Sequence, residues 1–139
     1  MGVSTDGQLC FGIAFEEEFM FPWTRDDDDE YEFEDWWREQ RGWTQQWSDG
    51  DETFFARRRE FDKEHPAPVE CVLHCSFDYP MYILALPGTS KSASRGYPTA
   101  IEVELTPLDD AAILKFCADS GIEMNDDQRG AWLLSSLWG

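Results

Sequence analysis

The sequence has few basic residues: 11 Lys and Arg stand against 29 Asp and Glu, which gives a formal net charge of −18. Such an excess of negative charge repels nucleic-acid phosphates, so we do not expect direct binding to DNA or RNA. It favours a basic partner instead.

Long apolar runs are also missing. None approaches the roughly 20 residues that a membrane-spanning helix needs, and the start MGVSTDGQ lacks the basic region of a signal peptide. We therefore expect no membrane association and a cytoplasmic location. The four cysteines (Cys10, Cys71, Cys75 and Cys117) lack the spacing of a disulfide framework, which fits a reducing compartment.

A metal-binding site is one possible function, because four potential ligands, His65, Cys71, His74 and Cys75, lie close in sequence. On a strand, Cys71 and Cys75 would share a face but lie about 13 Å apart at about 3.3 Å per residue. Zinc needs its sulfur ligands about 2.3 Å away, and His74 would point to the other face. We expect buried cysteines and no bound metal or cofactor.

No catalytic motif is present either. The loop Gly88–Gly96 lacks the Gly-Lys-Ser/Thr spacing of a phosphate-binding loop, and nothing lowers a thiol pKa for a Cys–His nucleophile. The run Asp26–Asp29 could attract divalent cations weakly, but it lacks the Gly and the closing Glu of an EF-hand. We expect that the protein is not an enzyme.

What is present suits a small folded body. The chain has 139 residues, 42% of them hydrophobic and 15% aromatic, which is enough for one domain over residues 1–139. Alternating or continuous apolar residues predict strands. The predicted strands are Gln8–Phe15, Val69–Phe77, Tyr82–Leu86 and Ala100–Leu105, the second and third joined by a turn at Asp78-Tyr79-Pro80.

Helical spacing of apolar residues and capping signals predict four helices. They are Tyr31–Arg41 capped by Asp28 or Asp29, Asp51–Glu64, one opened by Thr106-Pro107 and ended by Gly121, and Asp126–Leu137 with an Asn125/Gln128 capping box. The predicted fold class is therefore α+β, a single domain of about four mostly antiparallel strands packed with about four helices.

The acidic residues concentrate in the stretch Glu16–Asp35, EEEFMFPWTRDDDDEYEFED. It holds eleven acidic residues and one base, Arg25, and aromatic residues are interleaved with the charges. The simplest interpretation is a solubilising charge run. However, the stretch runs into an amphipathic helix that can hold its carboxylates in place, and the self-repulsion carries a folding cost.

A fixed row of carboxylates can imitate nucleic-acid phosphates and occupy the Lys/Arg groove of a DNA- or RNA-binding protein. Aromatic side chains such as Trp23 and Tyr31 could anchor the contact. The candidate partner-binding residues are Trp23, Asp26, Asp27, Asp28, Asp29, Glu30, Tyr31, Glu32, Glu34, Asp35 and Glu39. The helical subset, Glu32, Glu34, Asp35 and Glu39, has the clearest reason to be rigid.

Three segments, STDGQLCFGIAFEEEFMFPW, DYPMYILALPGTSKSASRGYP and WLLSSLWG, resemble a group of small proteins of unassigned chemistry carried by bacteriophages and prophages. The resemblance implies a phage accessory protein in the bacterial host cytoplasm. Small acidic phage proteins often inhibit host defences, so it also implies an anti-CRISPR or other anti-defence protein whose target is a basic host protein such as a CRISPR effector. It carries over no site residues.

Two alternatives stay open. One is a small enzyme or ligand-binding domain with a site over the sheet near His74, Tyr82 and Gly88–Gly96. The other is a structural component of the phage. The sequence leaves the oligomeric state open.

Overall fold

The computed structural model describes residues 5–25, 31–45, 47–48 and 50–138, and it has an α+β fold with a five-stranded mixed sheet and three helices. The chain divides into two compact units, Met1–Met20 with Pro68–Gly139, and Phe21–Ala67. The single domain expected from the length stays a prediction, because two compact units can still fold cooperatively.

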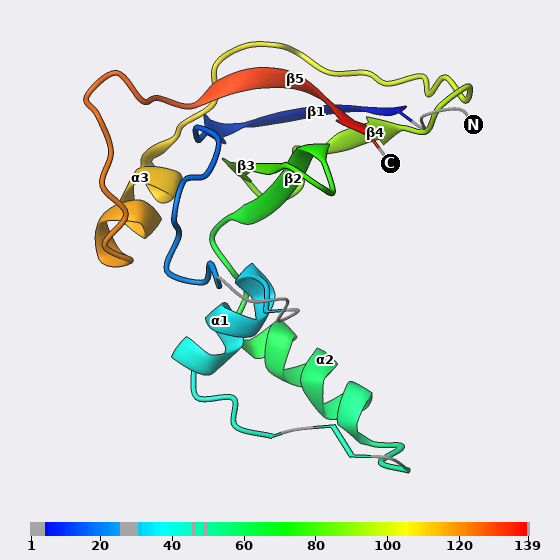
Figure 1. Ribbon diagram of the computed structural model, residues 1–139, viewed down its shortest axis with the longest axis vertical. Coiled ribbons are helices and arrows are strands. Elements are labelled where there is room, and N and C mark those ends of the chain that lie inside the picture. The colour runs from blue at the N-terminus through cyan, green and yellow to red at the C-terminus, as the bar shows by residue number, and fades with distance from the viewer. Residues whose placement is uncertain (1–4, 26–30, 46, 49, 139) are drawn as a thin grey trace. The chain divides into compact units, whose positions relative to one another are not determined.

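The first unit, the sheet unit, holds all five strands and one helix (Figure 1). Its elements are β1 Thr5–Ala14, β2 Glu70–Ser76, β3 Pro80–Ala85, β4 Lys91–Ala93, α3 Ala111–Asp119 and β5 Ala131–Trp138. The second, the helical unit, holds α1 Phe33–Gln40 and α2 Phe54–Glu64.

Strand β1 is the hub of the sheet. It pairs antiparallel with β5 over eight residues, with β4 at Gly7–Leu9 and with β3 at Gly12–Ala14. Strand β2 is antiparallel to β3 and meets β5 in parallel through Cys75 and Ser76. Strands β1, β3, β2 and β5 thus form a closed ring, which leaves few free strand edges.

Both faces of the sheet are buried near its centre. One face carries a cluster of Cys10, Ile83 and Ala85 with Val72 and Leu133 packed against it. The other carries residues that are at most 2% exposed, among them Phe11, Ile13 and Leu84. The large residues Phe11 and Ile13 of β1 thus face one core, and the smaller residue Cys10 on the opposite face is buried as well.

Gly12 allows the close approach of β1 and β3. A Cβ at this position would overlap the carbonyl oxygen of Leu84 and lie 2.8 Å from the Cα of Ala85. Only glycine therefore fits at this position of β1 without displacing β3.

The central hairpin is also confirmed. Strands β2 and β3 pair from Glu70 with Ala85 to Cys75 with Pro80, around the predicted turn. Strand β3 pairs with β1 as well, and its apolar centre, Ile83–Ala85, is buried, as expected for a central strand.

The predicted strand Ala100–Leu105 is wrong. These residues form no strand, and Ile101 and Leu105 are exposed by 43% and 61%. Their alternation would make a strand only beside an available strand edge, and β3, β4 and β5 already occupy both edges of β1. Thr106, the residue that follows this segment, contacts β5: its carbonyl accepts the Nε1–H of Trp132 at 2.8 Å.

The predicted last helix, Asp126–Leu137, is also wrong, because most of it is strand β5. The local capping signal is formed, since Asn125 N–H donates to Gln128 Oε1 at 2.8 Å, but only a turn follows. The ladder with β1 prevails over helical propensity, and Leu134 and Trp138 point outward with 83% and 56% exposure.

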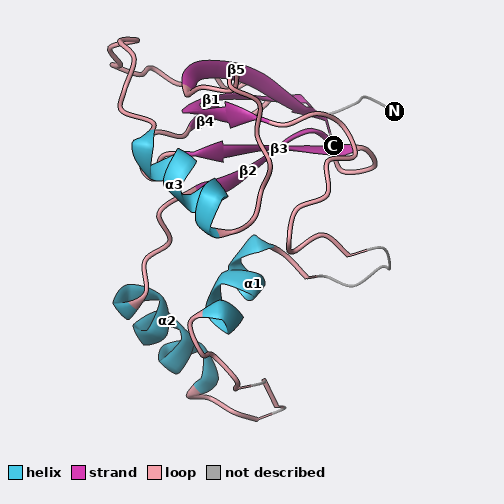
Figure 2. Cartoon of the chain, turned by 90° about the vertical axis from the view of Figure 1, so that its left-hand side faces the viewer, coloured by secondary structure: helices cyan, strands magenta, loops and turns pink. Residues whose placement is uncertain are grey.

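The third predicted helix exists, but it begins later than expected. Its N-cap is Asp110, not Thr106, and α3 starts at Ala111 beside the sheet (Figure 2). Ile113, Phe116 and Cys117 are its buried residues. Gly121 has φ +73°, and Ile122 N–H donates to Cys117 O at 2.9 Å, which is the predicted Schellman end.

In the helical unit, both helices start two or three residues later than predicted. The N-cap of α1 is Glu32, whereas the proposed caps Asp28 and Asp29 lie outside the described residues. The N-cap of α2 is Thr53, whose N–H and hydroxyl both donate to Asp51 Oδ1 at 3.1 and 2.9 Å.

Aromatic residues make the core of the helical unit. Trp23 stacks on Phe21 with ring centroids 4.8 Å apart and meets Phe33 edge-on at 5.0 Å. Trp43 similarly packs against Phe54 and Phe61 of α2. The described part of the chain contains no helix long and apolar enough to cross a bilayer.

Gly12→Ala should destabilise the protein by about 1–3 kcal/mol, because its Cβ meets backbone atoms that cannot move aside easily. The measurement is the free energy of unfolding in urea. Gly7→Ala is the matched control on the same strand, since no atom lies within 4 Å of its Cβ position. Equal losses in the two variants would contradict the close β1–β3 approach.

Candidate functional site

The candidate site is the acidic face of α1. Glu32, Glu34 and Glu39 are exposed and Asp35 is half-buried. At about 100° per residue, Glu32, Asp35 and Glu39 share one side of the helix, whereas Glu34 projects elsewhere. The helix was predicted to be amphipathic, and it buries Phe33 while Trp36 and Trp37 are half-buried.

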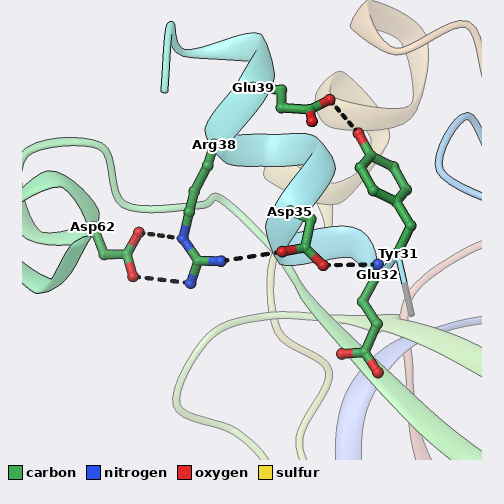
Figure 3. Close-up of polar contacts among 6 residues, drawn as sticks. All are labelled: Tyr31, Glu32, Asp35, Arg38, Glu39 and Asp62. Atoms are coloured by element: carbon green, nitrogen blue, oxygen red, sulfur yellow. Dashed lines mark hydrogen bonds and ion pairs between the residues drawn. The ribbon is translucent and has the colours of Figure 1, made fainter. Parts of the chain in front are cut away.

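Internal contacts hold two of these carboxylates in place (Figure 3). Asp35 Oδ2 accepts the backbone N–H of Glu32 at 3.0 Å, which ties the side chain to the N-cap. Glu39 Oε2 accepts the hydroxyl proton of Tyr31 at 2.6 Å. Acidic groups at the start of α1 also suit the positive end of the helix dipole.

Arg38 connects the acidic helix to α2. Its Nε–H and a terminal N–H donate to the two carboxylate oxygens of Asp62 at 2.8 and 3.0 Å, and Asp35 lies 3.7 Å away on its other side. This bidentate pair raises the pKa of Arg38, chiefly through the hydrogen bonds from the guanidinium to Asp62. A further bond joins Trp37 Nε1–H to the carbonyl of His65 at 2.9 Å.

Glu32 and Glu34 are the other two acidic residues of this face, and both are exposed. Glu32 belongs to the capping box of α1 with Asp35, and Figure 3 shows its carboxylate pointing away from the Arg38–Asp62 pair. Glu34 has no hydrogen-bond partner in the described part of the chain, and its charge contributes to the raised pKa of Arg38.

The structure corrects one of the proposed anchors. Trp23 is only 4% exposed and lies within the aromatic core of the helical unit, so it is not a surface contact. It was proposed because aromatic residues are interleaved with the acidic ones, but its large apolar ring is better buried. Tyr31 is half-buried, with the Arg25 guanidinium 4.1 Å from its ring centroid.

Five of the predicted site residues precede Tyr31 in the acidic run. Asp26, Asp27, Asp28, Asp29 and Glu30 lie outside the described residues. Any role for them in partner or cation binding stays a prediction.

Burial lowers the reactivity of two of the four cysteines. Desolvation raises the pKa of Cys10, to which the nearby Glu70 charge adds, and it raises the pKa of Cys117 to about 11. Both thiols are therefore protonated at neutral pH.

Among the described residues, no three His, Cys, Asp or Glu side chains are grouped so that they could hold a metal ion.

A second polar feature lies in the sheet unit and was missed by the sequence reasoning. The buried side-chain atoms Gln8 Oε1, His74 Nε2 and Ser135 Oγ have no hydrogen-bond partner in the described part of the chain. Gln8 and Ser135 are register partners on β1 and β5, and His74 precedes the β2–β5 contact. Burial lowers the pKa of His74 and so favours its neutral form.

Only the β pairing brings Gln8 and Ser135 side by side. Ser135 fell in a predicted helix, and Gln8 carried no motif signal. His74 was considered as a metal ligand because of its neighbours in sequence, not because of neighbours in space.

Tyr31 should ionise near pH 12, since its pKa is raised to about 12 by burial first and by the hydrogen bond and charge of Glu39 next. Because this exceeds the unfolded value of about 10, the stabilisation is complete below pH 10 and is lost as the pH rises through 12. The measurement is phenolate absorbance, as the difference between the wild type and Tyr31→Phe.

Glu39→Gln should lower the pKa of Tyr31, whereas Glu34→Gln, on the same helix but not bonded to Tyr31, should leave it unchanged. An unchanged titration in Glu39→Gln would show that the pair does not form.

Asp62→Asn should lower the free energy of unfolding by about 1–2 kcal/mol, because the Arg38 side chain, only 14% exposed, loses its charged partner. The free energy of unfolding can be measured by tryptophan fluorescence, because five of the seven tryptophans lie in residues 21–67. Glu60→Gln is the control: its pair with Lys63 spans 3.5 Å between side chains at least 70% exposed, so we expect a change within about 0.5 kcal/mol. Similar losses would argue against a structural role for Arg38–Asp62.

Comparisons with known proteins give no further guide: no protein-family model, no curated protein and no solved structure matches this chain.

Proposed function

We propose that this chain is a non-enzymatic binding protein that inhibits a basic, nucleic-acid-handling host protein through the carboxylates of α1. The observation that carries the proposal is the acidic face of α1, in which Asp35 and Glu39 are held by neighbours while Glu32 and Glu34 are exposed. Preorganised charges lose less conformational entropy on binding than mobile ones.

The basic groove of a nucleic-acid-binding protein is the complementary surface. Its Lys and Arg side chains are placed to neutralise closely spaced phosphates, and carboxylates can satisfy the same donors. Residues three or four apart on a helix rise roughly 4.5–6 Å along its axis, against about 3.4 Å per phosphate along one DNA strand. The imitation is therefore one of charge and not of phosphate spacing.

A phage inhibitor of host defence, such as an anti-CRISPR protein, is the biological class that we propose. The support is the resemblance of three segments to small phage and prophage proteins, together with the acidic surface. Competition with DNA for a CRISPR effector is the corresponding mechanism.

Glu32→Lys/Glu34→Lys should weaken inhibition at least about tenfold, because each reversal replaces an attraction to Lys or Arg by a repulsion. The measurement is DNA binding by a panel of purified CRISPR effectors and restriction enzymes, with added chain at low and high salt. Inhibition by the wild type should weaken as salt rises.

Glu102→Lys/Glu104→Lys is the matched control, since these two exposed residues have the same spacing and the reversal changes the net charge equally. Equal losses in both double variants would mean that net charge alone matters. Inhibition retained by Glu32→Lys/Glu34→Lys would contradict the assignment to α1. Melting temperatures show whether each variant remains folded.

A second candidate function is small-ligand binding in the sheet unit. The observation that favours it is that three buried side-chain atoms, Gln8 Oε1, His74 Nε2 and Ser135 Oγ, lack hydrogen-bond partners in the described part of the chain. Buried polar atoms in this state often accommodate a bound molecule or an ordered water. A thermal-shift screen with small polar molecules separates this function from the first, which needs a protein partner.

A further inference from the structure

A groove in the helical unit has features that the acidic helix does not explain. It has a volume of about 360 Å³ and lies between α2 and the loop that follows α1. It is lined by Trp43 and Gln45 from the loop and by Ala56, Arg57, Glu60, Phe61 and Glu64 from α2. This volume is near the lower end for ligand pockets and suits one side chain better than a large cofactor.

Two aromatic rings form the apolar part of the groove. The ring centroids of Trp43 and Phe61 are 5.1 Å apart, with the ring planes inclined by 59°. The ring of Trp43 also packs against Phe54, at 5.9 Å between centroids. The backbone N–H of Trp43 donates to the carbonyl of Arg38 at 2.9 Å. The aromatic surface is therefore rigid before any ligand arrives.

The one positive charge in the lining is already neutralised. Arg57 pairs with Asp51 at 2.8 Å, and it also donates to Gln45 at 2.5 Å and to the hydroxyl of Thr53. The same contacts, first of all the hydrogen bond from Arg57, hold the pKa of Asp51 below its ordinary value. Arg57 is thus held by residues of the chain.

The negative charges in the lining are less committed. Within the described residues Glu60 pairs with Lys63 alone, at 3.5 Å and with both side chains at least 70% exposed, and such pairs contribute little. Glu64 is exposed and has no ion-pair partner among the residues that the structure describes. The groove therefore combines an aromatic surface with two available carboxylates.

We propose that this groove binds an arginine side chain of the basic partner, with the guanidinium against Trp43 and paired to Glu60 or Glu64. Arginine fits better than lysine because its flat guanidinium stacks on aromatic rings and can pair with a carboxylate at the same time. The helical unit already contains such arginine–aromatic contacts: Arg41 lies 4.0 Å from the centroid of Trp37, and Arg25 lies 4.1 Å from that of Tyr31. The inference rests on the proposed function, in that it names the group of the partner that is recognised.

The test uses the full chain and N-acetyl-arginine amide, with N-acetyl-citrulline amide as its neutral isostere. Binding is followed through the indole N–H resonances of the tryptophans, assigned by substitution. The arginine compound should shift the Trp43 resonance with a dissociation constant in the roughly millimolar range, and the citrulline compound should shift it far less. Equal shifts with both compounds would overturn the proposal, because charge would then play no part.

Glu60→Gln/Glu64→Gln should weaken binding at least about fivefold without removing any core contact, since both side chains are exposed. Glu52→Gln is the carboxylate control and Trp47→Ala the aromatic control: both residues are exposed, close in sequence to the groove and outside its lining. Unchanged affinity in Glu60→Gln/Glu64→Gln, or the same loss in the controls, would overturn the assignment. Trp43→Leu should also abolish the effect, but it removes packing against Phe54 and Phe61 and is therefore secondary.

The outcomes separate this inference from the proposed function. If an effector is inhibited normally by Glu60→Gln/Glu64→Gln and the arginine compound does not shift Trp43, the groove assignment fails while the role of α1 stands. If the compound binds at Trp43 but no nucleic-acid-handling protein is inhibited, the groove assignment stands and the proposed function fails.

Discussion

Electrostatic self-repulsion is the constraint on which the rest of this molecule depends. A net charge of −18 on 139 residues opposes a compact state, and no charged side chain is buried among the described residues. The basic residues are distributed unevenly. Residues 21–67 contain seven of the eleven basic residues, whereas the sheet unit contains four basic residues and fourteen acidic ones. The closed ring of strands must therefore be held by apolar packing and backbone pairing.

The helical unit uses its bases to organise its acids. Arg38 joins α1 to α2 through Asp62, and Arg57 fastens the start of α2 to Asp51. Other arginines cover aromatic rings, as Arg41 does at Trp37. Glu34 and Glu64 are exposed and make no hydrogen bond or close ion pair with the described residues. Both proposed binding features use such exposed carboxylates.

Local patterns predicted much of the fold because they are satisfied within a few residues. The period-two pattern of Gln8–Phe15, the β2–β3 hairpin and the Gly121 helix end all have short-range causes. The acidic face of α1 was also predictable, since helical periodicity alone separates its aromatic stripe from its carboxylates. The start of each helix was predicted less well, because several Asp, Ser and Thr residues compete as caps.

The sequence by itself therefore determined the fold class, the charge excess and the two-faced helix α1. Only the tertiary structure decided that residues 131–138 form a strand, that Ala100–Leu105 do not, and that Trp23 is buried. The physical reason is that these outcomes depend on distant partners: β1 supplies a ladder for β5, and Phe21 and Phe33 supply a core for Trp23. The groove at Trp43 likewise exists only because α2 lies beside the loop after α1.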